Sequence, residues 1–142
     1  MPAAPDFFDT NVFIYAVDDA EPAKQQIARA LLKQALDSGS AVTSWQVVQE
    51  CLNVLKHRYR RTITAVRSKE MLHSVLTPLW KVMPSPSIYT SALDVQDRYG
   101  FAWYDSLVVA SALHAGCKRL LTEDLQHGQR IASLHIENPF RA

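Results

Sequence analysis

Short apolar runs alternate with longer helical patterns along the chain, and this alternation constrains the fold more than any other feature of the sequence. The short runs predict buried strands at 6–8, 41–43, 79–82, 119–122 and 134–136. Apolar residues at helical spacing predict helices at 12–17, 23–36, 47–55, 88–99 and 103–115, and a further helix from Thr62 or Thr64 to about Val75. Strands joined through helices pair in parallel. We therefore expect an α/β fold with a central, mostly parallel sheet flanked by helices.

The length and the charge of the chain limit the number of domains and the classes of protein that it can belong to. A chain of 142 residues fits one domain, which we expect to span 1–142. The formal net charge of +1 excludes a nucleic-acid binder that relies on a basic charge over the whole molecule, and it also excludes an acidic disordered chain. A partner that is recognised by charge must therefore contact a local patch.

The cysteines and the N-terminal residues indicate the cellular compartment in which the protein is expected. Cys51 and Cys117 lie in apolar patterns without the spacing of a zinc site, so we expect buried, reduced thiols. The first residues lack the features of a secretory signal, and no run approaches the roughly 18 apolar residues of a membrane span. We expect a cytoplasmic protein with no membrane contact.

Four acidic residues follow predicted strands or begin helices at one edge of the sheet. Asp9 follows the first strand, and Asp124 lies just beyond the strand at 119–122. Glu50 lies near the start of the helix that leaves the second strand, and Asp105 opens the most apolar helix. Ligands of open α/β sheets bind outside the carboxyl ends of the strands. The four carboxylates are therefore expected to converge there.

Convergence of carboxylates requires a neutralising partner, because like charges a few Å apart cannot all ionise. Oxygen ligands select hard cations, of which Mg²⁺ is the first choice and Mn²⁺ a substitute. Such a site fits hydrolysis of a phosphodiester by a metal-activated water. Each acid also has a structural interpretation: Asp9 and Asp105 as helix caps, Asp124 as a turn residue, and Glu50 as a solvated side chain.

The motifs around these acids resemble a known family. They are Phe-Asp-Thr-Asn-Val-Phe-Ile-Tyr-Ala at 8–16, Glu50, Tyr-Asp-Ser-Leu-Val-Val-Ala-Ser-Ala at 104–112, and Leu-Thr-Glu-Asp at 121–124. In this order the set resembles the PIN domain family, and the length of the chain resembles VapC-type toxins of type II toxin–antitoxin systems. The resemblance covers nearly the whole chain.

This resemblance implies a Rossmann-like, PIN-like fold, an endoribonuclease dependent on Mg²⁺ or Mn²⁺, a homodimer, and inhibition by a cognate antitoxin protein. By position it implies catalytic roles for Asp9, Glu50, Asp105 and Asp124. Asp9, Asp105 and Asp124 are the implied metal ligands, whereas Glu50 binds a second metal or orients water. Thr10, Asn11 and Thr122 are implied to hold the carboxylates by hydrogen bonds. Many relatives carry another acid and an aromatic after the last motif, where this chain has Gln126, His127 and Gly128.

Residues 51–69 contain six basic residues and no acid. Lys56, Arg58, Arg60 and Arg61 are therefore candidate contacts to RNA phosphates. The alternative is a solvated helix end, where cations complement the helix dipole. His127 likewise has two interpretations, as a contact to phosphate or as an exposed loop residue.

The sequence thus predicts a metal-dependent endoribonuclease that acts on RNA as the toxin of a toxin–antitoxin pair. Two alternatives remain open. One is a non-catalytic PIN-like scaffold that binds RNA or a protein. The other is a different magnesium-dependent phosphohydrolase, or a nuclease acting on DNA. Among such phosphohydrolases, an enzyme that forms an aspartyl phosphate would require an acid at position 11. This chain has Asn11 there, which argues against that mechanism.

Overall fold

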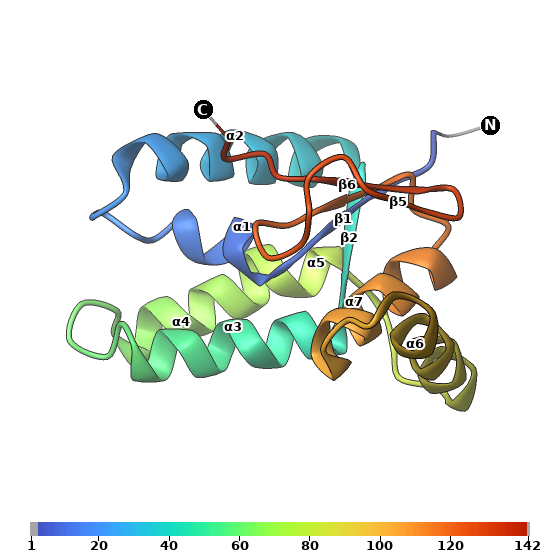
Figure 1. Cartoon of the computed structure of the whole chain (residues 1–142). Coiled ribbons are helices and arrows are strands. Elements are labelled where there is room, and N and C mark those ends of the chain that lie inside the picture. The colour runs from blue at the N-terminus through green and yellow to red at the C-terminus, as the bar shows by residue number, and fades with distance from the viewer. Residues whose placement is uncertain (1–2, 142) are drawn as a thin grey trace.

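A six-stranded sheet in the order β3-β2-β1-β4-β6-β5 forms the centre of the protein, as the computed structural model shows (Figure 1). The structure describes residues 3–141, so residues 1–2 and 142 of the predicted domain lie outside the described residues. The strands are β1 (Asp6–Phe8), β2 (Ala41–Ser44), β3 (Trp80–Val82), β4 (Arg119–Leu121), β5 (Arg130–Ile131) and β6 (Leu134–Glu137). All predicted strands are present, with small differences at their ends.

The strand pairing confirms the predicted sheet. β1 lies between β2 and β4 and pairs with both in parallel, and β2–β3 and β4–β6 are parallel pairs as well. β5 is the exception, because it pairs with β6 in the antiparallel sense. It was not predicted, since a strand of two residues carries no readable alternation. The carboxyl ends of β1, β2 and β4 consequently meet at one edge.

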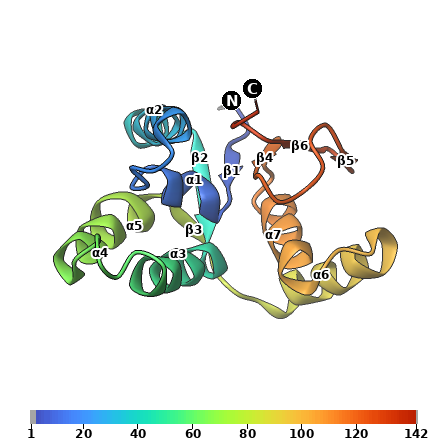
Figure 2. The ribbon, with the colours of Figure 1, turned by 60° about the vertical axis from the view of Figure 1, so that its left-hand side comes forward.

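The helices surround this sheet. They are α1 (Thr10–Tyr15), α2 (Pro22–Ser38), α3 (Trp45–His57), α4 (Ala65–Met71), the π-helical turn η1 (Leu72–Leu76), α5 (Thr77–Leu79), α6 (Pro86–Tyr99) and α7 (Trp103–His114). Figure 2 shows α1 to α5 on one side of β1 and α6 with α7 on the other. None of the helices in residues 3–141 combines the length and hydropathy that a membrane crossing requires.

Local sequence signals explain where the main helices begin and end. The hydroxyl of Ser44 accepts a hydrogen bond from the backbone N–H of Val47 and caps α3, and Ser85 caps α6 in the same way. Gly100 ends α6 with a φ of 73°, a left-handed conformation that glycine adopts without steric cost. These caps fix the starts of the helices that carry Glu50 and precede Asp105.

The core lies between the sheet and the helices and is built from apolar residues of nearly every element. Its largest fully buried side chains include Phe7, Phe13 and Leu120. Both cysteines are buried free thiols, which confirms their predicted burial. The helix α7 is buried along most of its length from Ser106 to Ala112, as its continuous apolar sequence predicts. A rigid core of this kind holds the edge where the acids lie.

Candidate functional site

Asp9 is placed by the end of β1. Its backbone N–H donates to the carbonyl of Leu121 at the end of β4, so the chain leaves the sheet at this residue. The side chain then caps α1 by accepting a hydrogen bond from the backbone N–H of Thr10 at 2.8 Å. Only 4% of Asp9 is exposed. A carboxylate is therefore fixed and nearly buried at the carboxyl edge.

Thr122 links Asp9 to Asp124. Its hydroxyl donates to the second carboxylate oxygen of Asp9 at 2.7 Å and accepts from the backbone N–H of Asp124 at 3.1 Å. Thr122 itself is fully buried. One hydroxyl thus fixes the carboxylate of Asp9 and the backbone that carries Asp124.

Glu50 is held from two elements. Thr10 Oγ1 donates to one carboxylate oxygen at 2.8 Å, and Gln46 Nε2 donates to the other at 2.9 Å. The same nitrogen of Gln46 lies 3.1 Å from the backbone carbonyl oxygen of Tyr104. Gln46 therefore bridges Glu50 on α3 to the residue that precedes Asp105 on α7, a link that no sequence signal indicates.

Asp105 lies in the first turn of α7, where its charge is favourable at the positive end of the helix dipole. The N-cap of α7 is Ala102 and makes no side-chain capping bond. The capping interpretation is therefore correct for Asp9 and wrong for Asp105. Asp105 is partly exposed and makes no capping hydrogen bond at the helix start.

The pKa shifts show which of the acids lie within electrostatic reach of one another. Burial raises the pKa of Asp9 to about 7, and the charges of Asp124 and Glu50 add to this against the hydrogen bonds from Thr122 and Thr10. Burial, then the charges of Asp124 and Glu50, raise the pKa of Asp105. Burial, then the charges of Glu123 and Glu50, raise the pKa of Asp124. Asp124 and Glu50 thus lie within electrostatic reach of both Asp9 and Asp105, whereas no effect of Asp9 and Asp105 on each other is resolved.

A groove of about 410 Å³ opens beside these acids. Its lining includes Thr10, Asn11, Glu50, Asp124 and Arg58. Asp9, which is buried, and Asp105 are not among its lining residues. A larger groove of about 700 Å³ between α2 and the α4–η1 segment contains none of the four acids. The smaller groove, which Glu50 and Asp124 line, is therefore the candidate site.

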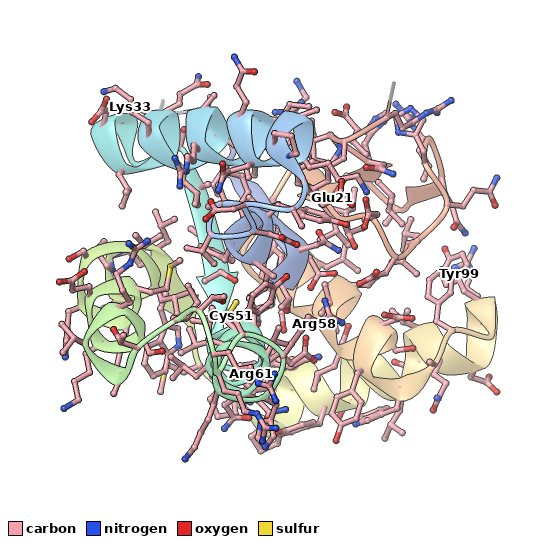
Figure 3. All side chains as sticks on the ribbon, turned by 90° about the vertical axis from the view of Figure 1, so that its left-hand side faces the viewer. Glu21, Lys33, Cys51, Arg58, Arg61 and Tyr99 are labelled. Atoms are coloured by element: carbon pink, nitrogen blue, oxygen red, sulfur yellow. The ribbon has the colours of Figure 1, made fainter. Side chains whose placement is uncertain are left out.

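Of the four basic residues that the sequence singles out, only Arg58 lines the acidic groove. Lys56, Arg60 and Arg61 are exposed outside it. Figure 3 labels Arg58 and Arg61 near this end of α3. The structure thus separates one arginine from the rest of the predicted basic patch.

The donor chemistry of the site fits a hard divalent cation. Every candidate ligand is an oxygen, and the buried Oδ1 of Asn11 has no hydrogen-bond partner within residues 3–141. In the same part of the chain, no group of three or more Asp, Glu, His or Cys side chains is arranged so that it could by itself hold a metal ion. Mg²⁺ suits this arrangement, because it binds through one or two carboxylates and completes its shell with water and phosphate oxygens.

Three residues beside the groove were not identified from the sequence. Tyr15 and Lys24 both donate hydrogen bonds to the carboxylate of Glu123. Partial burial alone would raise the pKa of Glu123, but these two bonds outweigh it and hold the pKa below its usual value. The contacts span 108 and 99 positions in the sequence. No local pattern could have indicated them.

His127 lies in the connection between β4 and β5 and is exposed. Its Nδ1 accepts a hydrogen bond from the backbone N–H of Asn138 at 3.0 Å. The ring therefore holds the segment after β6, which is a structural contact, and it does not line the acidic groove.

Comparison with known proteins places this geometry in a family. The family model of the PIN domain matches residues 7–132, whereas no curated protein matches the sequence. Among solved structures, a chain of a toxin–antitoxin complex from Klebsiella pneumoniae is similar at 16% identity, with 94% of this chain and 97% of that chain covered and a TM-score of 0.66. FitAcB from Neisseria gonorrhoeae is similar at 16% identity, with 96% and 99% covered and a TM-score of 0.63.

VapC20 from Mycobacterium tuberculosis, described as a sarcin-ricin loop cleaving toxin, is also similar in fold. Its identity is 21%, the alignment covers 84% of this chain and 91% of that chain, and the TM-score is 0.58. At these identities the structures establish the fold alone. The match to residues 7–132 includes all four acids and both strand ends that carry Asp9 and Asp124. The chain belongs to the PIN domain family.

Proposed function

We propose that this protein is an endoribonuclease that requires Mg²⁺ or Mn²⁺ and acts as the toxin of a toxin–antitoxin pair. One observation carries the proposal: none of the four acids at this edge of the sheet forms an ion pair within residues 3–141. Within residues 3–141, the ion pairs of Lys24, Lys33 and Arg119 involve other acids. The negative charge of Asp9, Glu50, Asp105 and Asp124 is therefore left to be neutralised by a cation.

Asp9 and Asp105 are proposed to hold the cation, with Asp124 completing the site. When bound, a divalent cation supplies positive charge that lowers the pKa of water and stabilises the leaving oxygen. The role of Thr122 is to keep Asp9 in one orientation, because its hydroxyl occupies one oxygen of that carboxylate. Asp9 has a pKa of about 7 as long as its charge is uncompensated, so cation binding and loss of its proton are coupled.

Glu50 is proposed to orient water or to bind a second cation. Each of its carboxylate oxygens accepts one hydrogen bond, from Thr10 or from Gln46. A carboxylate has about four acceptor positions, so each oxygen keeps one free. Glu50 is thus fixed in rotation and still able to accept a proton or a ligand at a defined place.

Arginine side chains outline a path for the RNA backbone. Arg58 lines both the acidic groove and a neighbouring groove of about 460 Å³, which Arg29 and Arg67 also line. Asp18 and Asp19 lie in the same wall, and their carboxylates accept hydrogen bonds from Tyr59, Ala20 and Gln25. Arginine matches phosphate geometry. We propose that phosphates adjacent to the cleaved bond contact Arg58 first.

The role as a toxin and the protein partners rest on the comparisons. The similar chains come from a toxin–antitoxin complex of Klebsiella pneumoniae, from FitAcB and from a sarcin-ricin loop cleaving toxin. We propose that an antitoxin protein binds this chain, that the chain forms a homodimer, and that it acts in the cytoplasm. Co-purification with the protein encoded beside it and light scattering after gel filtration test the two assemblies.

The decisive experiment is cleavage of a pool of structured RNAs by the purified protein with Mg²⁺, with Mn²⁺ or with a chelator. Asp9→Asn and Asp105→Asn serve as matched variants, because asparagine keeps the shape of the side chain and removes its charge. We expect cleavage with metal only and none by either variant. A parallel pool of DNA distinguishes a deoxyribonuclease.

RNA binding without cleavage under any metal, by folded wild-type protein, would replace this proposal with the non-catalytic scaffold. Cleavage that persists in both variants would show that the acids are not the site.

A further inference from the structure

Three residues from separate segments meet beside Asp124. Lys24, in the first turn of α2, donates to Oε2 of Glu123 at 2.7 Å. The hydroxyl of Tyr15, the last residue of α1, donates to Oε1 of the same carboxylate and accepts a bond from Lys24 at 3.2 Å. Both oxygens of Glu123 are therefore held, and the three side chains form a closed ring of hydrogen bonds.

Packing fixes this trio in place. The ammonium of Lys24 lies 4.7 Å from the centre of the Tyr15 ring, within range of a cation–π interaction. The Tyr15 ring in turn meets Phe140 edge to face, with ring centres 4.8 Å apart. Residues of α1, α2 and the segment after β6 thus converge on one carboxylate.

The trio is connected directly to the proposed active site. Glu123 lies in the chain between Thr122, which donates to Asp9, and Asp124, whose backbone N–H donates to Thr122. Tyr15 and Glu123 also line the same groove as Glu50 and Asp124. Holding the Glu123 side chain therefore holds the backbone from which Asp124 extends.

We propose that Lys24 and Tyr15 act as positioning residues for the proposed nuclease: by binding Glu123 they fix Asp124 at the site, and Lys24 compensates the charge of the Glu123 carboxylate. This inference rests on the proposed function. Without Lys24, Glu123 would place a further uncompensated carboxylate in the groove beside Asp124, which would repel the RNA backbone and compete for the cation. The ion pair removes that competitor.

A second ion pair on the same helix separates positioning from simple stabilisation. Lys33 binds Asp37 at 2.8 Å, almost the distance of the Lys24–Glu123 pair. The side chains of Lys33 and Asp37 are 78% and 65% exposed, whereas those of Lys24 and Glu123 are 31% and 28% exposed and adjoin the site. Exposed ion pairs contribute little to stability. Lys33→Met is therefore the matched control for Lys24→Met.

The experiment compares Lys24→Met, Lys24→Arg and Lys33→Met in RNA cleavage with saturating Mg²⁺. We expect Lys24→Met to lower kcat by about tenfold or more and to change KM by less than about threefold, because a small displacement of a reacting group slows the chemical step. Lys24→Arg should restore most of kcat, since arginine keeps the charge and the donors. Lys33→Met should match the wild type.

A double-mutant cycle tests whether Lys24 acts through Glu123. In a Glu123→Gln background, Lys24→Met should lower kcat by less than about twofold further, because residues that act through one contact are not additive. Independent multiplication of the two effects would overturn the inference.

Hydrogen exchange supplies a readout that does not depend on cleavage. We expect Lys24→Met to speed amide exchange at residues 123–125 by about tenfold in the folded protein, and Lys33→Met to leave it unchanged. Unchanged exchange, or faster exchange with an unchanged kcat, would overturn the positioning role. If the wild type cuts no RNA at all, the proposed function fails, and exchange at 123–125 still decides whether Lys24 fixes this segment.

Discussion

Strands β1 and β4 carry an aspartate and its partner at each end of their pairing, and the two ends differ in the kind of partner. At the amino end, Asp6 faces Arg119; at the carboxyl end, Asp9 faces Thr122. Both pairs join the same two strands, and the partners are 113 positions apart in each case. The two aspartates differ in their surroundings: Asp6 begins β1 and binds a charged side chain, whereas Asp9 follows β1, caps α1 and binds a neutral hydroxyl.

The amino end is electrically closed, in the sense that its acidic side chains bind a positively charged partner. Arg119 donates from Nε and Nη2 to the two oxygens of Asp6 at 2.9 and 2.6 Å, and from Nη1 to Glu137 at 2.9 Å. Such forked bonds are among the stronger side-chain interactions. The guanidinium thus gives both acids a positively charged partner.

The carboxyl end is electrically open, in the sense that the partner of Asp9 is an uncharged hydroxyl. Thr122 donates a hydrogen bond to Asp9 but brings no charge, and Asp124 and Glu50 add negative charge nearby. A hydroxyl orients a carboxylate and leaves its charge for a ligand. The same residue type thus joins the strands through an ion pair at one end and has no ion-pair partner within residues 3–141 at the other.

The largest expected difference between the two ends concerns activity. Asp9→Asn should lower kcat for RNA cleavage by about 1000-fold or more, equivalent to roughly 4 kcal/mol. Asp6→Asn should leave kcat within about twofold, because Asp6 lies at the opposite end of β1. Single-turnover cleavage, with circular dichroism to verify folding, measures both. Equal losses of kcat in the two variants would contradict the functional difference between the two ends of β1.

The second prediction concerns stability against pH. The pKa of Asp9 is raised from 3.8 to about 7 in the folded protein. Between these values the native state binds more protons than the unfolded state, so the free energy of unfolding falls as pH rises from about 4 to 7. Asp9→Asn should remove this loss, which is on the order of 4 kcal/mol.

Urea unfolding of both proteins at pH 5 and pH 8, with a chelator present, checks this stability difference. Relative to the wild type, the free energy of unfolding of the variant should increase at pH 8 only. A gap between the two proteins that stays constant with pH would show that Asp9 is ionised throughout.

The third prediction tests the neutral partner at the open end. Thr122→Val keeps the size and the burial of the side chain and removes the hydroxyl between Asp9 and Asp124. We expect kcat to fall by about tenfold, because both groups lose a fixed orientation. Thr122→Ser retains the hydroxyl and should keep most of the activity. Steady-state cleavage of one defined RNA measures both, and equal rates would contradict the role.

The smallest effect is expected at the closed end. Arg119→Met removes the forked bonds to Asp6 and the bond to Glu137. These side chains are partly exposed, so the loss should be about 1 kcal/mol of unfolding free energy. Cleavage should be unaffected. Thermal unfolding followed by circular dichroism detects the change, and a loss of activity at full stability would contradict it.

The sequence was sufficient where one residue carries a local signal. Asp9 and Asp124 each follow a strand, and Asp105 opens a strongly apolar helix, so their common edge follows from the sheet topology. The outline of most helices was predictable for the same reason. Local periodicity and strand order together determine these positions.

The parts that escaped prediction depend on contacts between distant segments or on very short elements. Lys24 and Glu123 meet only because α2 passes the end of β4, and Gln46 reaches Tyr104 across two helices. The helix predicted to end near Val75 continues through the π-helical turn η1 and α5 to Leu79. Periodicity does not reveal this change of winding, which inserts additional backbone within one turn.

The two outer strands of the sheet have a consequence for assembly. β3 has three residues, with Lys81 exposed, and β5 has two residues. Such short edges offer few unpaired backbone groups, and a charged side chain further opposes the addition of a strand. A partner protein is therefore expected to bind through the helices and loops of this molecule. The short sheet edges also disfavour aggregation by addition of strands.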